Sequence, residues 1–523
     1  MNVLERAIAV VSPQTAVKRA GARQKLRILN SGYGNYGAST TKKSTLGWIF
    51  GGGSAKEDIQ DNLSTLRQRS RDLYMGVPIA TGALKTYRTN VVGMGLRLKS
   101  QIDYEYLGLT EEQARELEAG IEREFGLWAD SPACDLERLD NFCELQQLAF
   151  LNWLLSGDVL ALLPTTKRVN MPYDLRVRLI EADRLSNPHG NTDPKIVGGV
   201  EKNDAGEVVA YHFSTHHPLS WEASEPKWTR VEAYGKKTGR RNVIHVMNRE
   251  RIGQLRGVPL LAPVIESLKQ LGRYTDAELV AAVVSGMYTV FIEHESASSD
   301  FPTGEVVPES QQVDAEDENS IELAAGTVVD LGTGEKAHDM NPGRPNTAFD
   351  GFVVAICRQI GTALEIPYEV LVKQFNSSYS ASRAALLEFW KSVKMYRSWL
   401  ANDFCQPIFE EFLCEAVAKG RVSAPGFFAD PMIRKAYCGA EWYGPAQSSL
   451  NPVQDADAAE KRVQSGFSTR EREAVEMTGT DYYRNIQHRK QEEKMMKEVA
   501  SNGRTEQKPP EQPADAGAAP GTE

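Results

Sequence analysis

The sequence contains few cysteines, and none are paired at the spacing that metal sites or redox centres use. Six cysteines are spread irregularly over 523 residues without a C-x-x-C pair, so neither zinc ligation nor dithiol redox chemistry is indicated. Such sparse use is typical of proteins that fold in a reducing, cytosolic setting. Cys357, Cys405 and Cys414 lie within apolar helical patterns and are interpreted as buried thiols.

Long hydrophobic runs are also missing. No stretch approaches the ~18 consecutive apolar residues that a membrane-spanning helix needs. The apolar start from Ala7 to Val11 is short and follows Glu5 and Arg6, which makes it a poor signal peptide. With 41% hydrophobic and 25% charged residues, the composition is that of a soluble folded protein without a membrane partner.

An excess of positive charge is absent as well, because the formal net charge is −10. Proteins that hold nucleic acid through a broad basic face neutralise phosphates with many cations. The composition therefore argues against tight DNA binding over a wide surface. It leaves open a protein that DNA slides past.

The sequence lacks the common catalytic signatures. There is no G-x-x-x-x-G-K-[ST], H-E-x-x-H or G-x-S-x-G motif and no calcium loop. Gly32, Gly34 and Gly37 form a G-x-G-x-x-G pattern, but it stands between Arg-rich and Ser/Thr-rich segments, not between a strand and a helix. The carboxylates form solvated runs, so we expect no enzyme, no cofactor and no metal.

The histidines give one weak signal. His212, His216 and His217 form a cluster, and alternation along a strand places His212 and His216 on one face. No carboxylate partner is evident from the sequence. Surface or packing histidines are therefore favoured over a metal site.

What the sequence does contain is a long helical block between residues 345 and 420. Apolar residues recur at spacings of three and four up to Leu364, and Pro367 interrupts the pattern. A polar stretch, Lys373–Ser380, follows before the pattern resumes near Ala381. Pro407 predicts a kink or helix boundary near Gln406. The block is either two core helices joined by a surface loop or a long helix with the loop presented at its tip.

The remaining chain predicts an α+β fold. Helices are expected over residues 58–74, 78–91, 110–128, 141–155 and 257–286, and strands over 96–100, 159–163, 175–180, 208–213 and 243–246. An acidic, Pro/Ser-rich stretch at 293–320 divides two helices, as an insert at the far end of an antiparallel helix pair does. Charged helical composition returns over 455–497, with breaks near Gly466 and Gly479.

Six short stretches stand in an order and at spacings that are specific when taken together. They are 89–96 (TNVVGMGL), 180–185 (IEADRL), 256–259 (RGVP), 366–369 (IPYE), 378–383 (SYSASR) and 441–445 (EWYGP). On these stretches the chain, from about Tyr74 to Lys497, resembles the portal proteins of tailed bacteriophages, in particular the lambda-like family.

The resemblance implies a ring of identical subunits, typically twelve, at one capsid vertex, with double-stranded DNA passing through its axial channel during packaging and ejection. It also implies a subunit plan with these segments: a flexible N-terminal arm 1–53, a wing 54–257, a first stem helix 258–285, a clip 286–344, a second stem helix 345–366, a tunnel loop 367–380, a long tunnel-side helix 381–420, a crown 421–498 and a disordered tail 499–523.

Two groups of site residues follow from the same resemblance. The tunnel loop would line the DNA channel with Lys373, Gln374, Phe375, Asn376, Ser377, Ser378 and Tyr379. Lys373 is its one cation able to touch a phosphate, and Phe375 and Tyr379 are expected to anchor the loop because duplex bases are already paired. The acidic clip would dock the packaging motor and later the adaptor, through Glu293, Glu295, Asp300, Glu305 and Glu309.

The implied partners are further copies of this chain, DNA in transit, the terminase large subunit, a head-completion or tail adaptor protein, and the major capsid and scaffolding proteins. The implied location is the virion, with assembly in the host cytoplasm. Two alternatives remain open at this point. One is a head–tail adaptor or scaffold ring without a DNA-contacting loop, and the other is a DNA-processing enzyme with a dispersed site.

Overall fold

The computed structural model describes most of the chain between residues 51 and 502. The described residues are 51–287 without 191–192 and 222–224, then 291–294, 335–338, 348–447 without 376–377, and 451–502, with a few single positions before residue 51. Two compact units are distinct, Met1–Asp58 and Ile59–Glu523. The first ends in the short helix α3 (Ala55–Asp58). None of the helices in these ranges is long and apolar enough to cross a membrane.

Helices from the first third of the second unit surround its main core. They are α4 (Leu63–Gly76), α5 (Pro78–Val91), α6 (Tyr104–Leu107), α7 (Glu111–Ala129) and α8 (Phe142–Ser156). Pro78 stands in the first turn of α5, where a backbone N–H has no helical partner to lose. Capping boxes at Thr110 and Asn141 start α7 and α8. The ranges predicted for α5, α7 and α8 are confirmed to within one or two residues.

The start of α4 differs from the prediction. Residues Gln60–Asn62 form a 3-10 turn, and the α-helix begins at Leu63 instead of Asp58. Asp61 and Asn62 explain the delay, because short polar side chains compete for backbone groups and favour turns and caps over helix interiors.

The described strands form two larger sheets and two strand pairs, all antiparallel. One sheet has the order β3-β2-β8, with β2 (Asp158–Leu162) between β3 (Arg178–Ile180) and β8 (Val243–Met247). The other has the order β4-β5-β6-β7, made of Ile196–Val197, Val200–Lys202, Val208–Ser214 and Trp228–Glu232. One strand pair joins distant parts of the chain, β1 (Arg97–Ser100) with β11 (Ala440–Tyr443).

The strand predictions are confirmed in place for 96–100, 159–163, 208–213 and 243–246. The prediction for 175–180 is too long, because only Arg178–Ile180 forms a strand there. Strands β4, β5 and β7 were not predicted. They are short or carry charged residues at several positions, so their sequences show no apolar alternation.

The histidine interpretation needs a correction. His212 Nε2 on β6 lies 2.8 Å from Glu201 Oε2 on β5, and Arg230 of β7 donates to the same carboxylate. A carboxylate partner therefore exists, one strand away and invisible in the linear pattern. Among the residues with assigned positions, no group of three or more His, Cys, Asp or Glu side chains is placed to hold a metal ion.

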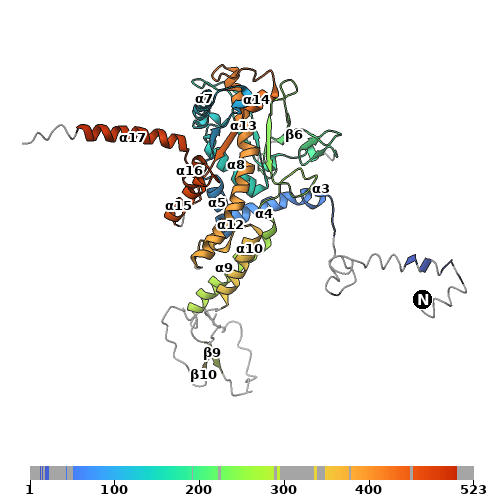
Figure 1. Ribbon diagram of the computed structural model, residues 1–523. Coiled ribbons are helices and arrows are strands. Elements are labelled where there is room, and N and C mark those ends of the chain that lie inside the picture. The colour runs from blue at the N-terminus through green and yellow to red at the C-terminus, as the bar shows by residue number, and fades with distance from the viewer. Residues whose placement is uncertain are drawn as a thin grey trace, which may run out of the picture. The chain divides into compact units, whose positions relative to one another are not determined.

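Two long helices pack side by side at the end of the unit that lies away from the sheets (Figure 1). They are α9 (Ile265–Met287) and α10 (Phe349–Ala363). The ring of Tyr274 lies 5.5 Å from that of Phe349 and 4.9 Å from that of Phe352, measured between centroids. Between these helices in sequence, β9 (Phe291–His294) pairs with β10 (Glu335–His338). The predicted order of helix, β-containing insert and helix is confirmed.

The first of these helices starts later than predicted. Residues 257–261 are not helical, and Ala262–Val264 form a 3-10 turn before α9 begins at Ile265. The Leu260 N–H donates to Leu154 O in the last turn of α8 at 2.9 Å. The segment that contains Pro259 and Pro263 therefore attaches the start of α9 to α8.

The long helical path after residue 378 is present. Helix α12 (Tyr379–Leu400) continues through a π-helical turn (Ala401–Cys405) into α13 (Gln406–Ala418), and the short α11 (Tyr368–Leu371) precedes it. The irregularity predicted near Gln406 is confirmed as the π-turn just before Pro407, which has no N–H to donate.

The C-terminal part is helical. It contains α14 (Pro431–Tyr437), α15 (Pro452–Gln464), α16 (Arg470–Thr478) and α17 (Tyr482–Asn502). The breaks predicted near Gly466 and Gly479 are confirmed. Helix α17 extends to Asn502, beyond the expected start of the tail at residue 499, and residues 503–523 lie outside the described part.

An aromatic cluster forms the centre of the main core. The ring of Phe125 on α7 lies between 5.2 and 5.9 Å from five others, those of Trp128, Phe142, Phe409, Phe412 and Trp442. A smaller apolar cluster between the two larger sheets includes Leu160, Tyr211 and Phe213. Helix α13 is therefore buried along its length, whereas the first turn of α12 is largely exposed.

Candidate functional site

The loop that the sequence analysis expects to line the DNA channel, Lys373–Tyr379, begins just after α11 ends. The Val372 N–H donates to Tyr368 O, and the Gln374 N–H donates to Glu369 O, each at 3.0 Å. Lys373 between them is left-handed, with φ of 57°, as the residue after a helix often is. Its side chain is exposed and has no hydrogen-bond or ion-pair partner within the described ranges.

The other described residues of the loop, Gln374, Phe375, Ser378 and Tyr379, are open to solvent in the single chain. Phe375 is 53% exposed and Tyr379 is 51% exposed, so the expectation that these rings anchor the loop is not met within one subunit. Ser378 caps α12 by accepting a hydrogen bond from the Ala381 N–H at 3.4 Å. Asn376 and Ser377 lie outside the described residues.

A buried tyrosine on α5 links the segments on both sides of the loop. The Tyr87 ring lies 5.5 Å from that of Phe389 and 5.2 Å from that of Tyr396, both on α12. Its hydroxyl donates to Leu364 O at the end of α10, at 2.8 Å. Burial raises the pKa of Tyr87, so the hydroxyl keeps its proton and remains a donor. The exposed loop is therefore held between two fixed helices.

The acidic clip residues are mostly outside the described part. Glu293 stands on β9 opposite Lys336 of β10. Glu295, Asp300, Glu305 and Glu309 lie outside the described residues.

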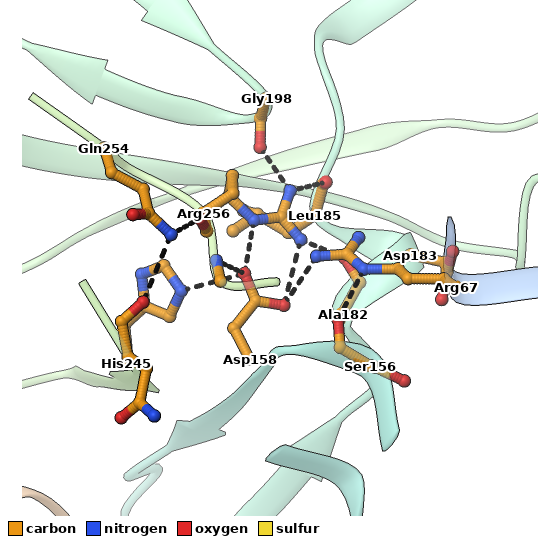
Figure 2. Close-up of polar contacts among 12 residues, drawn as sticks. Arg67, Ser156, Asp158, Ala182, Asp183, Leu185, Gly198, His245, Gln254 and Arg256 are labelled. Atoms are coloured by element: carbon orange, nitrogen blue, oxygen red, sulfur yellow. Dashed lines mark hydrogen bonds and ion pairs between the residues drawn. The ribbon is translucent and has the colours of Figure 1, made fainter. Parts of the chain in front are cut away.

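The carboxylate of Asp158, at the start of β2, is fully buried (Figure 2). Asp158 receives hydrogen bonds from Arg67 Nη2 at 2.7 Å, from Arg256 Nε at 2.6 Å, and from the Gly257 N–H at 3.2 Å. His245 Nε2 lies 3.2 Å from its second oxygen. The expectation that the carboxylates form only solvated runs is wrong for Asp158.

Electrostatics keep this group charged. Burial alone would raise the pKa of Asp158, but the guanidinium groups of Arg256 and Arg67 outweigh it and hold the pKa well below its usual range. Burial lowers the pKa of Arg67 to about 10 against the opposing attraction of Asp158. The other guanidinium hydrogens go to backbone carbonyl oxygens of Ser156, Ala182, Leu185 and Gly198. Two guanidinium groups share one carboxylate, and their remaining hydrogens are bound to backbone carbonyls, so we interpret the cluster as a structural joint.

Two of the short stretches singled out in the sequence meet at this joint. Arg256 belongs to the stretch 256–259, and the carbonyls it binds on Ala182 and Leu185 belong to 180–185. Gly257 is required there because a Cβ atom would lie 1.8 Å from Gly157 O. The joint fixes the segment that leads into α9 against the sheet.

Two more stretches meet at α12. Arg397 donates to Asn90 O and Val91 O in the last turn of α5, at 2.8 and 3.1 Å, and to Pro445 O at 2.8 Å. Burial lowers the pKa of Arg397 to about 10. The carbonyl end of a helix attracts a cation, so this arginine ties 89–96 and 441–445 to the long helix. The stretches were visible in the sequence, but their meeting point was not.

A groove of about 450 Å³ separates α12 from α15 and α16. Most of its charged lining residues are paired with one another, as Arg383–Asp455 at 3.0 Å, Lys394–Glu476 at 3.4 Å and Arg462–Glu473 at 2.6 Å. Two of these pairs, Arg383–Asp455 and Lys394–Glu476, join the C-terminal helices to α12.

Sequence comparison places this fold among known proteins. Residues 41–397, more than half of the chain, match the family of phage portal proteins of the lambda family. The chain is 24% identical over 439 residues to portal protein B of Escherichia phage lambda. This alignment covers 80% of this chain and 82% of that protein. It is 25% identical over 456 residues to the portal protein of Escherichia phage N15, covering 83% and 85%.

Solved structures of low sequence identity align with the chain as well. The neck of a native gene transfer agent particle, computed with C12 symmetry, aligns over 79% of this chain and 92% of its own, with a TM-score of 0.44 and 14% identity. A virion of the native gene transfer agent particle aligns with a TM-score of 0.43 and 13% identity, over the same shares of the two chains.

Proposed function

The chain belongs to the lambda family of phage portal proteins, and on that premise we propose that its copies close into a ring, typically of twelve, at one capsid vertex. Double-stranded DNA passes through the axial channel inward during packaging and outward at ejection. The loop from Lys373 to Tyr379 faces that channel in each subunit. The observation that carries this proposal is the exposed Lys373 side chain, which has no polar partner among the residues that the structure describes and stands between the packed helices α11 and α12.

The charge of the chain suits a conduit. Each phosphate contact adds a salt-dependent attraction that moving DNA has to break. One lysine per loop, on a chain of formal net charge −10, gives a weak and repeated contact in place of tight binding. Phe375 and Tyr379 are half exposed in the single chain, so they are available to pack on a neighbouring loop in the ring.

Exposed apolar side chains on the two long helices support assembly. Leu279, Val280 and Val283 on α9 are 65%, 62% and 50% exposed, and Phe352 on α10 is 48% exposed. Head-to-tail contacts in a closed ring bury on one neighbour what each subunit leaves open. We assign these faces to the contact between adjacent copies.

The remaining partners follow the same plan. The insert between α9 and α10, which includes β9 and β10, docks the terminase large subunit during filling and a head-completion or tail adaptor afterwards. The major capsid and scaffolding proteins surround the ring, which assembles in the host cytoplasm and remains in the virion. Catalysis belongs to the motor, and this chain needs neither cofactor nor metal for its role.

Removal of the loop tests the proposal. A variant without Lys373–Ser380 should form rings with a central opening in negative-stain images, yet fail to package or retain DNA in capsids assembled with the cognate terminase. Lys391→Ala is the control for loss of an exposed cation, because Lys391 lies on α12 outside the loop and is exposed like Lys373. Full packaging by the deletion variant would instead favour a head–tail adaptor or scaffold ring without a DNA-contacting loop. Turnover of DNA in the presence of ATP and divalent metal would favour an enzyme.

A further inference from the structure

Helices α10 and α11 end in the same unusual way. In each, the first residue after the helix cap is left-handed without being glycine, Glu365 with φ of 55° and Lys373 with φ of 57°. Hydrogen bonds complete the turn in both cases, from the Ile366 N–H to Gly361 O and from the Gln374 N–H to Glu369 O. Glycine is the ordinary residue at this position because a side chain there is strained.

The Glu365 side chain has a specific contact that glycine would lack. Its Oε2 accepts a hydrogen bond from Ser392 Oγ at 2.9 Å, and Ser392 lies in the middle of α12. The main chain beside it is bound as well, because the Tyr87 hydroxyl donates to Leu364 O at 2.8 Å. The turn between α10 and α11 is thus held from two sides. Tyr87 of α5 binds the backbone of the turn at Leu364 O, and Ser392 of α12 binds the carboxylate of Glu365.

The position of this turn determines where the loop begins. Only the seven residues 366–372 separate Glu365 from Lys373, and four of them form α11. Val370 and Leu371 of α11 are buried, and α11 packs against α5, α10 and α12. The turn and Lys373 are therefore joined by a short, packed connection.

We propose that Glu365 is a positioning residue for the DNA-facing loop, which holds the junction of α10 and α11 against Ser392 and so fixes the height of Lys373 along α12. The inference rests on the proposed function of the loop. Helix termination alone does not explain a glutamate at this position, since glycine ends a helix in this way with less strain. The carboxylate is exposed, and the partner that distinguishes it from an ordinary surface charge is the Ser392 hydroxyl on α12.

Substitutions at the two ends of the hydrogen bond test the proposal in the full-length ring. Glu365→Gly removes the carboxylate and the strain together, and Glu365→Gln keeps an oxygen that accepts from Ser392. Ser392→Ala removes the donor and leaves the residues of the turn itself unchanged, although it also removes a hydroxyl that contacts Tyr87. Glu388→Gln, at an exposed glutamate on the same helix, is the control for loss of charge.

We expect Glu365→Gly to leave the ring intact and the unfolding temperature within about 2 °C of the wild type, while the DNA packaging rate falls about fivefold. Ser392→Ala should lower the rate by a similar factor, and the double variant should be no slower than either single one, because both remove the same bond. Glu365→Gln should restore the rate to within about twofold, and Glu388→Gln should match the wild type.

Wild-type packaging by Ser392→Ala overturns the inference, even if Glu365→Gly fails to assemble. Equal loss in Glu365→Gln and Glu365→Gly also overturns it, because the acceptor oxygen would then be irrelevant. The loop deletion separates this failure from failure of the proposed function. If the deletion abolishes packaging while Ser392→Ala does not slow it, the loop acts on DNA but Glu365 does not position it.

Discussion

The Nε of Arg256 lies 2.6 Å from Oδ2 of Asp158, and neither side chain is more than 3% exposed. Arg67 reaches the other oxygen of the same carboxylate from α4. One anion therefore holds together strand β2 at the centre of its sheet, helix α4 and the segment that leads into α9. The integrity of the subunit depends on this group remaining charged.

Asp158→Asn should be strongly destabilising. The amide keeps the shape of the carboxylate but leaves Arg67 and Arg256 buried without their counter-ion, which costs about 3–5 kcal/mol in comparable cases. Chemical denaturation of the purified chain measures the loss. Asp130→Asn is the control, since its pair with Arg97 is more than 60% exposed on both sides and should change stability by less than ~1 kcal/mol. Similar effects from both variants would contradict the role assigned to Asp158.

Two glycines offer a second comparison. Gly257→Ala places a methyl group 1.8 Å from Gly157 O, so the two backbone segments must separate, at a cost of roughly 1–3 kcal/mol or more. Gly120→Ala in α7 meets nothing within 4 Å and should stabilise the helix by about 0.5–1 kcal/mol. Opposite shifts of the denaturation midpoint are expected, and a neutral Gly257→Ala would show that the joint is loose.

Acid should destabilise the sheet β4-β5-β6-β7 by protonating Glu201 on β5. Hydrogen bonds from Arg230 lower the pKa of Glu201 to about 2, below the ~4.3 of an unperturbed glutamate. A lowered folded pKa contributes stability above about pH 4.3, and that contribution disappears as the pH falls toward 2. The stability difference between the wild type and Glu201→Gln should therefore shrink between pH 5 and pH 2.5. A constant difference across that range would contradict the ion pair.

Lys373 permits stability and function to be separated. Lys373→Gly should stabilise the chain by ~1 kcal/mol, because glycine adopts the left-handed conformation without strain. Lys373→Ala keeps the strain and loses the amino group. Both should slow DNA packaging to the same extent, and less than deletion of the loop does. Slower packaging by the glycine variant alone would mean that the backbone conformation, and not the charge, matters at this position.

The exposed face of α9 should govern assembly. Leu279→Glu puts a charge on a side chain that is 65% exposed in the single chain, so the subunit should fold normally. If neighbouring copies bury this side chain, ring formation should need a higher protein concentration, which sedimentation velocity detects. Gln270→Glu adds a charge at an already polar, exposed position of the same helix and should assemble like the wild type. Unchanged assembly of Leu279→Glu would place the subunit contact elsewhere.

Local pattern was enough to locate most helices. The ends of α7 and α8 follow from capping residues next to apolar periodicity, and the π-turn follows from Pro407 inside a helical run. The start of α9 was placed too early because Pro259 and Pro263 are tolerated in a first turn, and only the bond from Leu260 to α8 shows that the segment is not helical there. Strands β4, β5 and β7 have no apolar alternation to reveal them.

The contacts that hold the site together could not be predicted in the same way. Asp158 looks like any carboxylate in the sequence, and its partners Arg67 and Arg256 lie far from it on both sides. The strain at Glu365 and Lys373 depends on how two helices end in three dimensions. What the sequence could indicate was the polar loop itself, because a run of Asn, Ser and Gln interrupts two strongly apolar helical patterns.

The pairing of β1 with β11 has a consequence for biosynthesis. Arg97 stands opposite Tyr443 in that pair, so the ribosome must make most of the chain before the first strand finds its partner. Until then the backbone groups along that edge of β1 have only water to bind. A nascent or prematurely terminated subunit therefore presents an open strand edge, which distinguishes it from a finished one before it reaches an assembling shell.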